Sequence, residues 1–133
     1  MIDIENDVFN AVATSLRTSY AGIFVSGEKV AAPATYPFVS IVEADNYGYV
    51  RGEDSSLDEH FVNVMYEVEV ITKKTSGKKS ACKAIFSTLD SNFLNMGFRR
   101  VMRKPIPMDD AMTYKLVGRY SAVVSADKTI YRR

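Results

Sequence analysis

Phe61-Val62-Asn63-Val64-Met65-Tyr66-Glu67-Val68-Glu69-Val70-Ile71-Thr72 carries the clearest structural pattern in the 133-residue chain. Every second residue from Val62 to Val70 is apolar or aromatic, and polar residues stand at several of the positions between them. Side chains of a strand point alternately to the two faces of a sheet, so the pattern predicts a strand with one face on the core. The other face mixes polar and apolar groups, as faces that contact another subunit often do; it carries Asn63, Glu67 and Glu69 beside Phe61, Met65 and Ile71.

Two amphipathic helices are expected, one on each side of this strand in the sequence. Apolar residues recur every four positions near the N-terminus, which predicts a helix over residues 4–19 that Asp3 can cap. A second apolar stripe begins at Cys82 and predicts a helix that ends at Met96. Gly97 follows it where a left-handed C-cap belongs.

Four further segments are predicted to be strands: residues 23–25, 38–44, 98–105 and 114–124. Residues 45–60 lack apolar periodicity and predict a long exposed loop, whereas the polar tail 125–133 predicts a flexible arm. Short connections between consecutive strands favour antiparallel pairing. The sequence therefore predicts one α+β domain over residues 1–133, with a single, mostly antiparallel sheet and two helices packed on one face.

Composition narrows the classes of function. Seventeen Lys and Arg against sixteen Asp and Glu leave a net charge of +1, which disfavours a polyanionic partner held by bulk charge. No uninterrupted apolar stretch is long enough for a membrane span, and the acidic N-terminus lacks the features of a secretion signal. A single cysteine fits a reducing cytoplasm. We expect a protein without membrane segments and without enzymatic activity.

No residue pattern predicts a catalytic, metal or cofactor site. His60 lacks ligands at metal-binding spacing, and Cys82 lies on the apolar stripe of the second helix. The turn at 75–80 lacks the first glycine and the Lys-Ser/Thr step of a phosphate-binding loop. Glu67 and Glu69 share a strand face without an evident catalytic partner, which favours a solvated or interface role.

The densest basic cluster is Arg99, Arg100, Arg103 and Lys104. A regular strand would place Arg99 and Arg103 on one face and Arg100 and Lys104 on the other. Nucleic-acid binding would require aromatic platforms among these residues, and only Phe98 is close in the sequence. Contact with an acidic neighbour, such as residues 53–59 of another copy, is the more economical interpretation.

The order of elements resembles the tail terminator, or tail completion, proteins of long-tailed bacteriophages and related prophage particles. The resemblance runs across most of the chain and rests on pattern and length rather than on a signature motif. The matching segments are the N-terminal helix, Tyr36-Pro37-Phe38-Val39, the strand Val62–Val70, the Lys-rich turn, Leu94-Asn95-Met96-Gly97-Phe98, the basic strand, and Arg119-Tyr120-Ser121-Ala122-Val123-Val124.

The resemblance implies a structural virion protein that assembles in the host cytoplasm. Such proteins form a hexameric ring on the head-proximal end of the tail tube, end its polymerisation and dock the capsid connector. The implied partners are further copies of the chain, the tail tube protein and the connector or stopper protein. Head-to-tail contacts that close by rotation would build the ring; the candidate contact residues are Glu53, Asp54, Asp58, Glu59, Met65, Glu67, Glu69, Arg99, Arg100, Arg103 and Lys104. The acidic loop and the basic strand are expected on different interfaces.

Three alternatives remain open on the sequence. A head–tail stopper or connector completion protein would be equally small and equally poor in reactive groups. A small α+β ligand-binding domain or enzyme would build its site from Tyr47, Tyr49, Arg51 and His60. A nucleic-acid-binding accessory protein would show retention on DNA that depends on salt concentration.

Overall fold

The alternating pattern at residues 61–72 forms a strand, as predicted: it is β3 (Phe61–Lys73), and it lies at the centre of the sheet. The computed structural model describes residues 2–30, 33, 35–48 and 61–131. The elements that accompany β3 are α1 (Glu5–Ser19), β1 (Phe24–Ser26), β2 (Phe38–Gly48), α2 (Lys78–Met96), β4 (Arg99–Ile106), β5 (Thr113–Ser125) and β6 (Ile130–Tyr131). The strand order is β1-β2-β3-β5-β4, and β6 pairs with β5. The β1–β2 pair is parallel and every other pair is antiparallel, which confirms the predicted α+β class.

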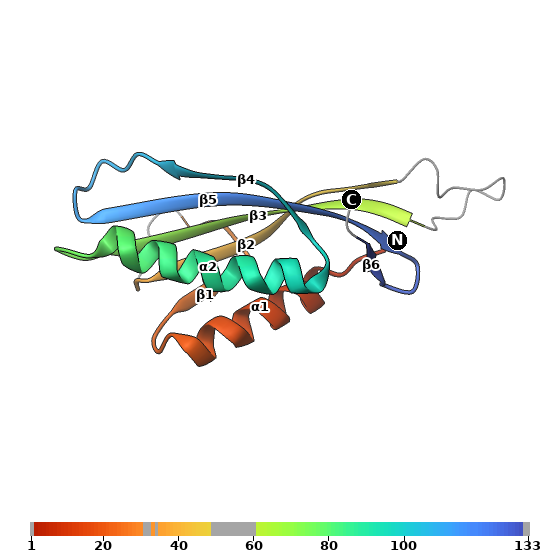
Figure 1. Ribbon diagram of the computed structural model, residues 1–133, viewed down its shortest axis with the longest axis horizontal. Helices are drawn as coiled ribbons and strands as arrows, with labels where there is room; N and C mark the ends of the chain where they lie inside the picture. The colour runs from red at the N-terminus through yellow and green to blue at the C-terminus, as the bar shows by residue number, and fades with distance from the viewer. Residues whose placement is uncertain (1, 31–32, 34, 49–60, 132–133) are drawn as a thin grey trace.

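Both helices cover the same face of the sheet (Figure 1). α2 packs on β3 and β5 through Ile85, Phe86, Leu89 and Phe93, and α1 packs against α2 and β2. α1 begins at Glu5, whose backbone N–H donates to the carboxylate of Asp3 over 3.0 Å. Gly97 ends α2 in the left-handed conformation that its position predicts. Neither helix in the described ranges has the length and apolar character needed to span a membrane.

An aromatic cluster fills the core between α2 and the sheet. Phe93 of α2 stacks on Tyr120 of β5 with the ring centroids 4.4 Å apart. Phe98 meets Phe93 and Tyr66 edge to face, at 5.3 Å and 5.5 Å. Offset and edge-to-face contacts between rings stabilise a core beyond the area they bury. This cluster joins the second helix to the two longest strands.

Two predicted boundaries are wrong. β2 continues to Gly48 rather than ending at residue 44, because a register shift between Glu43 and Asp45 interrupts the alternation that the sequence pattern relies on. The tail does not extend from the fold as an arm over its described part: Ile130 and Tyr131 pair with Val124 and Val123. Residues 132–133 lie outside the described part of the chain.

Candidate assembly interface

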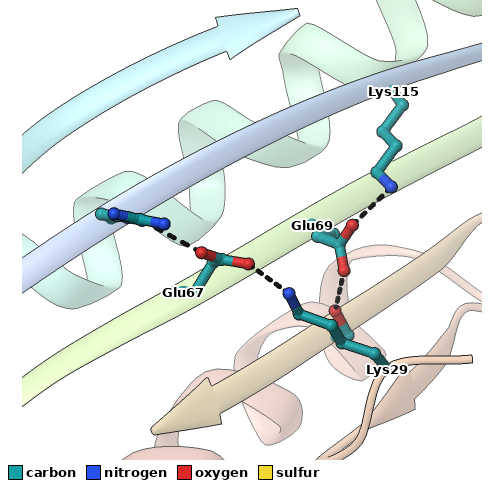
Figure 2. A network of polar contacts seen from close by, with 6 residues as sticks. Lys29, Glu67, Glu69 and Lys115 are labelled. Carbon is teal, nitrogen blue, oxygen red and sulfur yellow. Dashed lines mark hydrogen bonds and ion pairs between the residues drawn. The ribbon is translucent and has the colours of Figure 1, made fainter. Parts of the chain in front are cut away.

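The face of the sheet opposite the helices carries a charged network centred on Glu67 and Glu69 (Figure 2). The Glu67 carboxylate accepts from Lys29 Nζ at 2.5 Å and from Arg119 Nε at 3.0 Å. The Glu69 carboxylate lies 2.5 Å from Lys115 Nζ and accepts a hydrogen bond from a serine hydroxyl, Ser40 Oγ, at 3.4 Å. Both acids are therefore neutralised within the subunit.

Lys29 and Arg119 also set the acidity of Glu67. The hydrogen bond from Lys29, followed by that from Arg119, lowers the pKa of the Glu67 carboxyl against the opposing effect of burial. The same contact raises the pKa of Lys29. Glu67 thus stays ionised below the pH at which an unfolded glutamate becomes protonated.

Replacing Glu67 with glutamine is expected to lower the free energy of unfolding by about 1 kcal/mol at neutral pH, because Lys29 and Arg119 lose a shared carboxylate on a partly buried face. A lowered pKa in the folded state contributes stability that is present above the unfolded pKa and is lost as pH falls through the folded pKa. The difference in unfolding free energy between wild type and Glu67→Gln should therefore shrink below about pH 4.5, the ordinary pKa of a glutamate carboxyl. Urea titrations at neutral and acidic pH measure it.

The matched control is Glu28→Gln, because Glu28 is exposed and forms no ion pair with a described residue. Its effect should stay within about 0.5 kcal/mol at every pH. A Glu67→Gln effect that persists undiminished at acidic pH would contradict the role assigned to the carboxylate charge.

The basic strand β4 differs from its prediction because a bulge interrupts it. The register with β5 shifts between Arg100 and Met102, so Val101 is the extra residue. Arg99 and Lys104 consequently share the outer face, and Arg100 and Arg103 share the helix face. The predicted division, which assumed a regular strand, is wrong for this reason.

The two helix-face arginines are held by α2. Arg100 donates to Asp90 Oδ1 over 3.1 Å, and the hydroxyl of Tyr120 donates to the same oxygen over 2.6 Å. The Arg103 guanidinium lies over the ring of Phe86, 5.7 Å from its centroid. These contacts connect the basic strand to the core.

β4 lies at one edge of the sheet, and all but two of its residues are exposed. Arg99 and Lys104 form no ion pair with any residue in the described ranges. Val101 at the bulge is 43% exposed. Of the predicted interface residues, Arg99 and Lys104 therefore combine an exposed charge that has no ion pair among the described residues with a position on an edge strand.

The remaining predicted residues divide into two groups. Met65 is half-buried on the outer face, in the same row of the sheet as Ser121 and Arg99. The acidic residues of the predicted loop and the additional residues of the ligand-binding alternative lie outside the described part of the chain: Glu53, Asp54, Asp58, Glu59, Tyr49, Arg51 and His60. Tyr47, the remaining residue of that alternative, is 45% exposed in β2.

An acidic group that was not among the predicted site residues lies beside β2. Glu43 and Asp45 lie on either side of the β2 bulge, and the Glu5 carboxylate of α1 accepts from the Glu43 backbone N–H over 3.3 Å. Burial raises the pKa of Glu43, and the nearby charges of Glu5 and Asp3 add to the shift. The sequence shows that the first turn of α1 is acidic, but only the tertiary structure shows that this turn lies beside β2.

A cavity of about 400 Å³ opens between the end of α1, the first half of α2 and the start of β2. Tyr20, Tyr36, Pro37, Lys73, Lys74 and Ile85 are among its lining residues. Two of its polar side chains have partners within the chain: the Tyr20 hydroxyl donates to the Ala84 carbonyl, and Lys73 lies over the Tyr36 ring. The described residues contain no group of His, Cys, Asp and Glu that could hold a metal ion.

Cys82 has the environment expected of a core residue. It is fully buried, and its thiol donates to the Val70 carbonyl over 3.3 Å. Burial raises the pKa of the thiol to about 11, so the nucleophilic thiolate is scarce at neutral pH. The burial of Cys82 agrees with its predicted place on the apolar stripe of the second helix.

Comparisons with known proteins show the fold alone. No protein-family model and no curated protein matches the chain. Among solved structures 24 chains match. One of them, a protein whose name describes no function, superposes with a TM-score of 0.52 over 87% of this chain and 92% of its own, at 13% sequence identity.

Proposed function

We propose that the chain is a structural subunit of a phage or prophage particle that caps the head-proximal end of the tail tube. Copies form a ring, expected to be hexameric, that ends tube polymerisation and docks the capsid connector. The subunit assembles in the host cytoplasm, remains in the virion tail and performs no catalysis. The resemblance in element order supports this assignment.

One observation carries the proposal: the uneven use of charge across the sheet. The carboxylates at its centre are neutralised inside the subunit, whereas Arg99 and Lys104 stand exposed on an edge strand without an ion pair among the described residues. A basic, partly apolar edge of this kind is suited to an acidic neighbour in an assembly.

Deleting the gene for this chain from a particle-producing strain is the direct test. We expect tails of uncontrolled length and filled heads without attached tails in electron micrographs, since the tube would lack its terminator. Supplying the wild-type chain in trans should restore joined particles of uniform tail length. Uniform tails still joined to heads after the deletion would overturn the proposal.

The same micrographs separate the stopper alternative. Loss of a stopper would leave tails of normal length that fail to join heads, because tube polymerisation ends normally. Loss of a terminator changes tail length as well. Tail length measured on unattached tails therefore distinguishes the two roles.

A ligand-binding function is the second candidate, and the cavity beside Tyr36 and Lys73 is the observation that favours it. Its volume falls in the range of small-molecule sites, about 300–1,000 Å³. Its lysines would favour an anionic, partly apolar compound. A thermal-shift screen of aromatic carboxylates tests this candidate; stabilisation that Ala84→Trp abolishes would support it, and the absence of any stabilising compound would count against it.

A further inference from the structure

In the described part of the chain, two edges of the sheet of matching length have no strand paired along them. β4 forms one edge with eight residues. On the other side, β1 pairs only with Phe38–Ser40 of the 11-residue strand β2. No described strand pairs with the remaining residues 41–48 along that side. The β4 edge presents backbone groups that can accept another strand. On the β2 side the Glu43 N–H already donates to the Glu5 carboxylate, so a strand that pairs there must displace this one contact.

The two edges carry opposite charge. Arg99, Arg100, Arg103 and Lys104 make the β4 edge basic. Glu43 and Asp45 make the β2 edge acidic, and Glu5 of α1 contacts the same segment. Among described residues, neither Asp45 nor Arg99 has an ion-pair partner. The edges are complementary in sign.

The complementary charges also lie in the same rows of the sheet. One row on the outer face runs Asp45, Met65, Ser121, Arg99. The next row, on the helix face, runs Glu43, Tyr66, Tyr120, Arg100. Each edge has its bulge between these two rows, at Ala44 in β2 and at Val101 in β4. Extending the sheet row by row would therefore place acid opposite base in both rows. Only the outer-face row, Asp45 and Arg99, has charges without an ion pair among the described residues.

Strand direction permits this extension. β2, β3, β5 and β4 are each antiparallel to the next, so β4 runs opposite to β2. A second copy can thus place its β2 antiparallel to β4 of the first copy while the helices of both copies stay on the same side. The contact ends at Arg103, because the rows of Lys104 and Ile106 lead to the part of β2 that β1 already occupies.

We propose that residues 99–103 of one copy pair with residues 41–45 of a second copy and continue the sheet. Arg99 then faces Asp45 of the second copy, and this pair carries the contact. Arg100 lies in the row of Glu43 of the second copy, but within each subunit Arg100 pairs with Asp90 and the Glu43 carboxylate accepts from the Tyr66 hydroxyl. The contact uses two different surfaces, so it repeats head to tail and builds a ring or a filament. The inference rests on the proposed function only for the closure of the ring.

Charged residues on an edge strand commonly prevent association. Here the charges oppose only the pairing of like edges, β4 with β4 or β2 with β2, because those arrangements place like charges opposite one another. Pairing β4 with β2 brings opposite charges together. The charges therefore disfavour symmetric dimers and select the head-to-tail contact.

Charge reversal tests the pairing by analytical ultracentrifugation and native mass spectrometry across the micromolar range. Arg99→Asp and Asp45→Arg should each weaken self-association by about tenfold or more, because each sets like charges opposite one another. An equimolar mixture of the two variants should recover the wild-type association, since either variant can alternate with the other around an assembly. Lys83→Glu, an exposed charge reversal on α2, is the matched control and should change nothing.

Cysteine pairing provides a readout that does not depend on affinity. A chain with both Arg99→Cys and Asp45→Cys should form a ladder of disulfide-linked oligomers on oxidation, whereas mixed single variants should stop at a linked dimer. Cys82, the natural cysteine, is buried and should not compete. Both substituted side chains are exposed, so each variant is expected to fold. Circular dichroism checks this.

A wild-type chain that stays monomeric at every concentration, or an unchanged association in Arg99→Asp, would overturn this contact. A linked dimer in Arg99→Cys alone would do the same, because it would place like edges together. The gene-deletion phenotype is independent of these outcomes. If the deletion strain makes normal tails while the edge contact is observed, only the capping function is refuted. If the edge contact fails while the deletion strain shows the terminator phenotype, only the contact is refuted.

Discussion

Phe93→Ala is expected to lower the free energy of unfolding by about 4 kcal/mol, a large part of the roughly 5–15 kcal/mol that stabilises a domain. Phe93 is fully buried, and its ring contacts three others, those of Tyr66, Phe98 and Tyr120. Truncation removes the stacked contact with Tyr120 and leaves a cavity between α2 and the sheet. Because the side chains around it belong to different elements, they cannot all close on the space.

Thermal unfolding followed by far-ultraviolet circular dichroism measures this loss, with an expected fall in melting temperature of roughly 15 °C. Phe9→Ala is the matched control, since Phe9 is a half-buried residue of α1 and should cost about 1 kcal/mol. Phe93→Leu should fall between the two variants because it keeps most of the volume. Equal losses in Phe93→Ala and Phe9→Ala would contradict the central role of the aromatic cluster.

The sequence predicts those parts of the fold that depend on local periodicity. The alternation in β3 and the four-residue spacing of α1 each report one buried face, and the structure buries Val62, Val64 and Leu16 accordingly. The C-terminal strand β6 escaped prediction because two residues are too few to show a period. A hydrogen-bonded turn from Ser125 to Thr129 brings β6 back onto β5, where Ile130 also lies close to Gly97 at the end of α2.

The candidate interface was predictable in composition but not in geometry. The basic cluster of β4 is visible in the sequence, yet its division between two faces is set by a bulge that forms only through pairing with β5. Likewise, the partners of Glu67 come from the β1–β2 connection and from β5, which no local pattern joins. The sequence shows which residues are charged, but the register of the strands decides which charged side chains meet.

Gly118→Val is expected to lower the free energy of unfolding by about 3 kcal/mol and to displace the basic edge strand. A Cβ at Gly118 would lie 2.5 Å from Cζ and 3.0 Å from Cε2 of the Phe86 ring, closer than packed carbon atoms approach. It would also lie 3.4 Å from the Met102 carbonyl of β4. The ring must therefore move away from the sheet, and Arg103, which lies over the same ring, must move with it.

A double-mutant cycle with Phe86→Leu separates this clash from a general weakness of β5. The smaller side chain of leucine leaves space for a Cβ at position 118. Gly118→Ala should therefore destabilise the Phe86→Leu variant less than it destabilises the wild type, by a difference of about 0.5 kcal/mol or more. Losses that simply add would show that the Phe86 ring does not limit position 118. The graded order wild type, Gly118→Ala, Gly118→Val should hold in urea unfolding.

The same variants connect packing to assembly. Gly118 pairs with Arg103 in the register of β5 and β4, at the end of the segment proposed to contact a second copy. If that contact requires the native position of β4, Gly118→Ala should weaken self-association under conditions where the chain remains fully folded, although position 118 is buried and carries no charge. Phe86→Leu should restore association together with stability. Restored stability without restored association would show that the edge tolerates displacement, and that charge alone governs the pairing of Arg99 with Asp45 of the second copy.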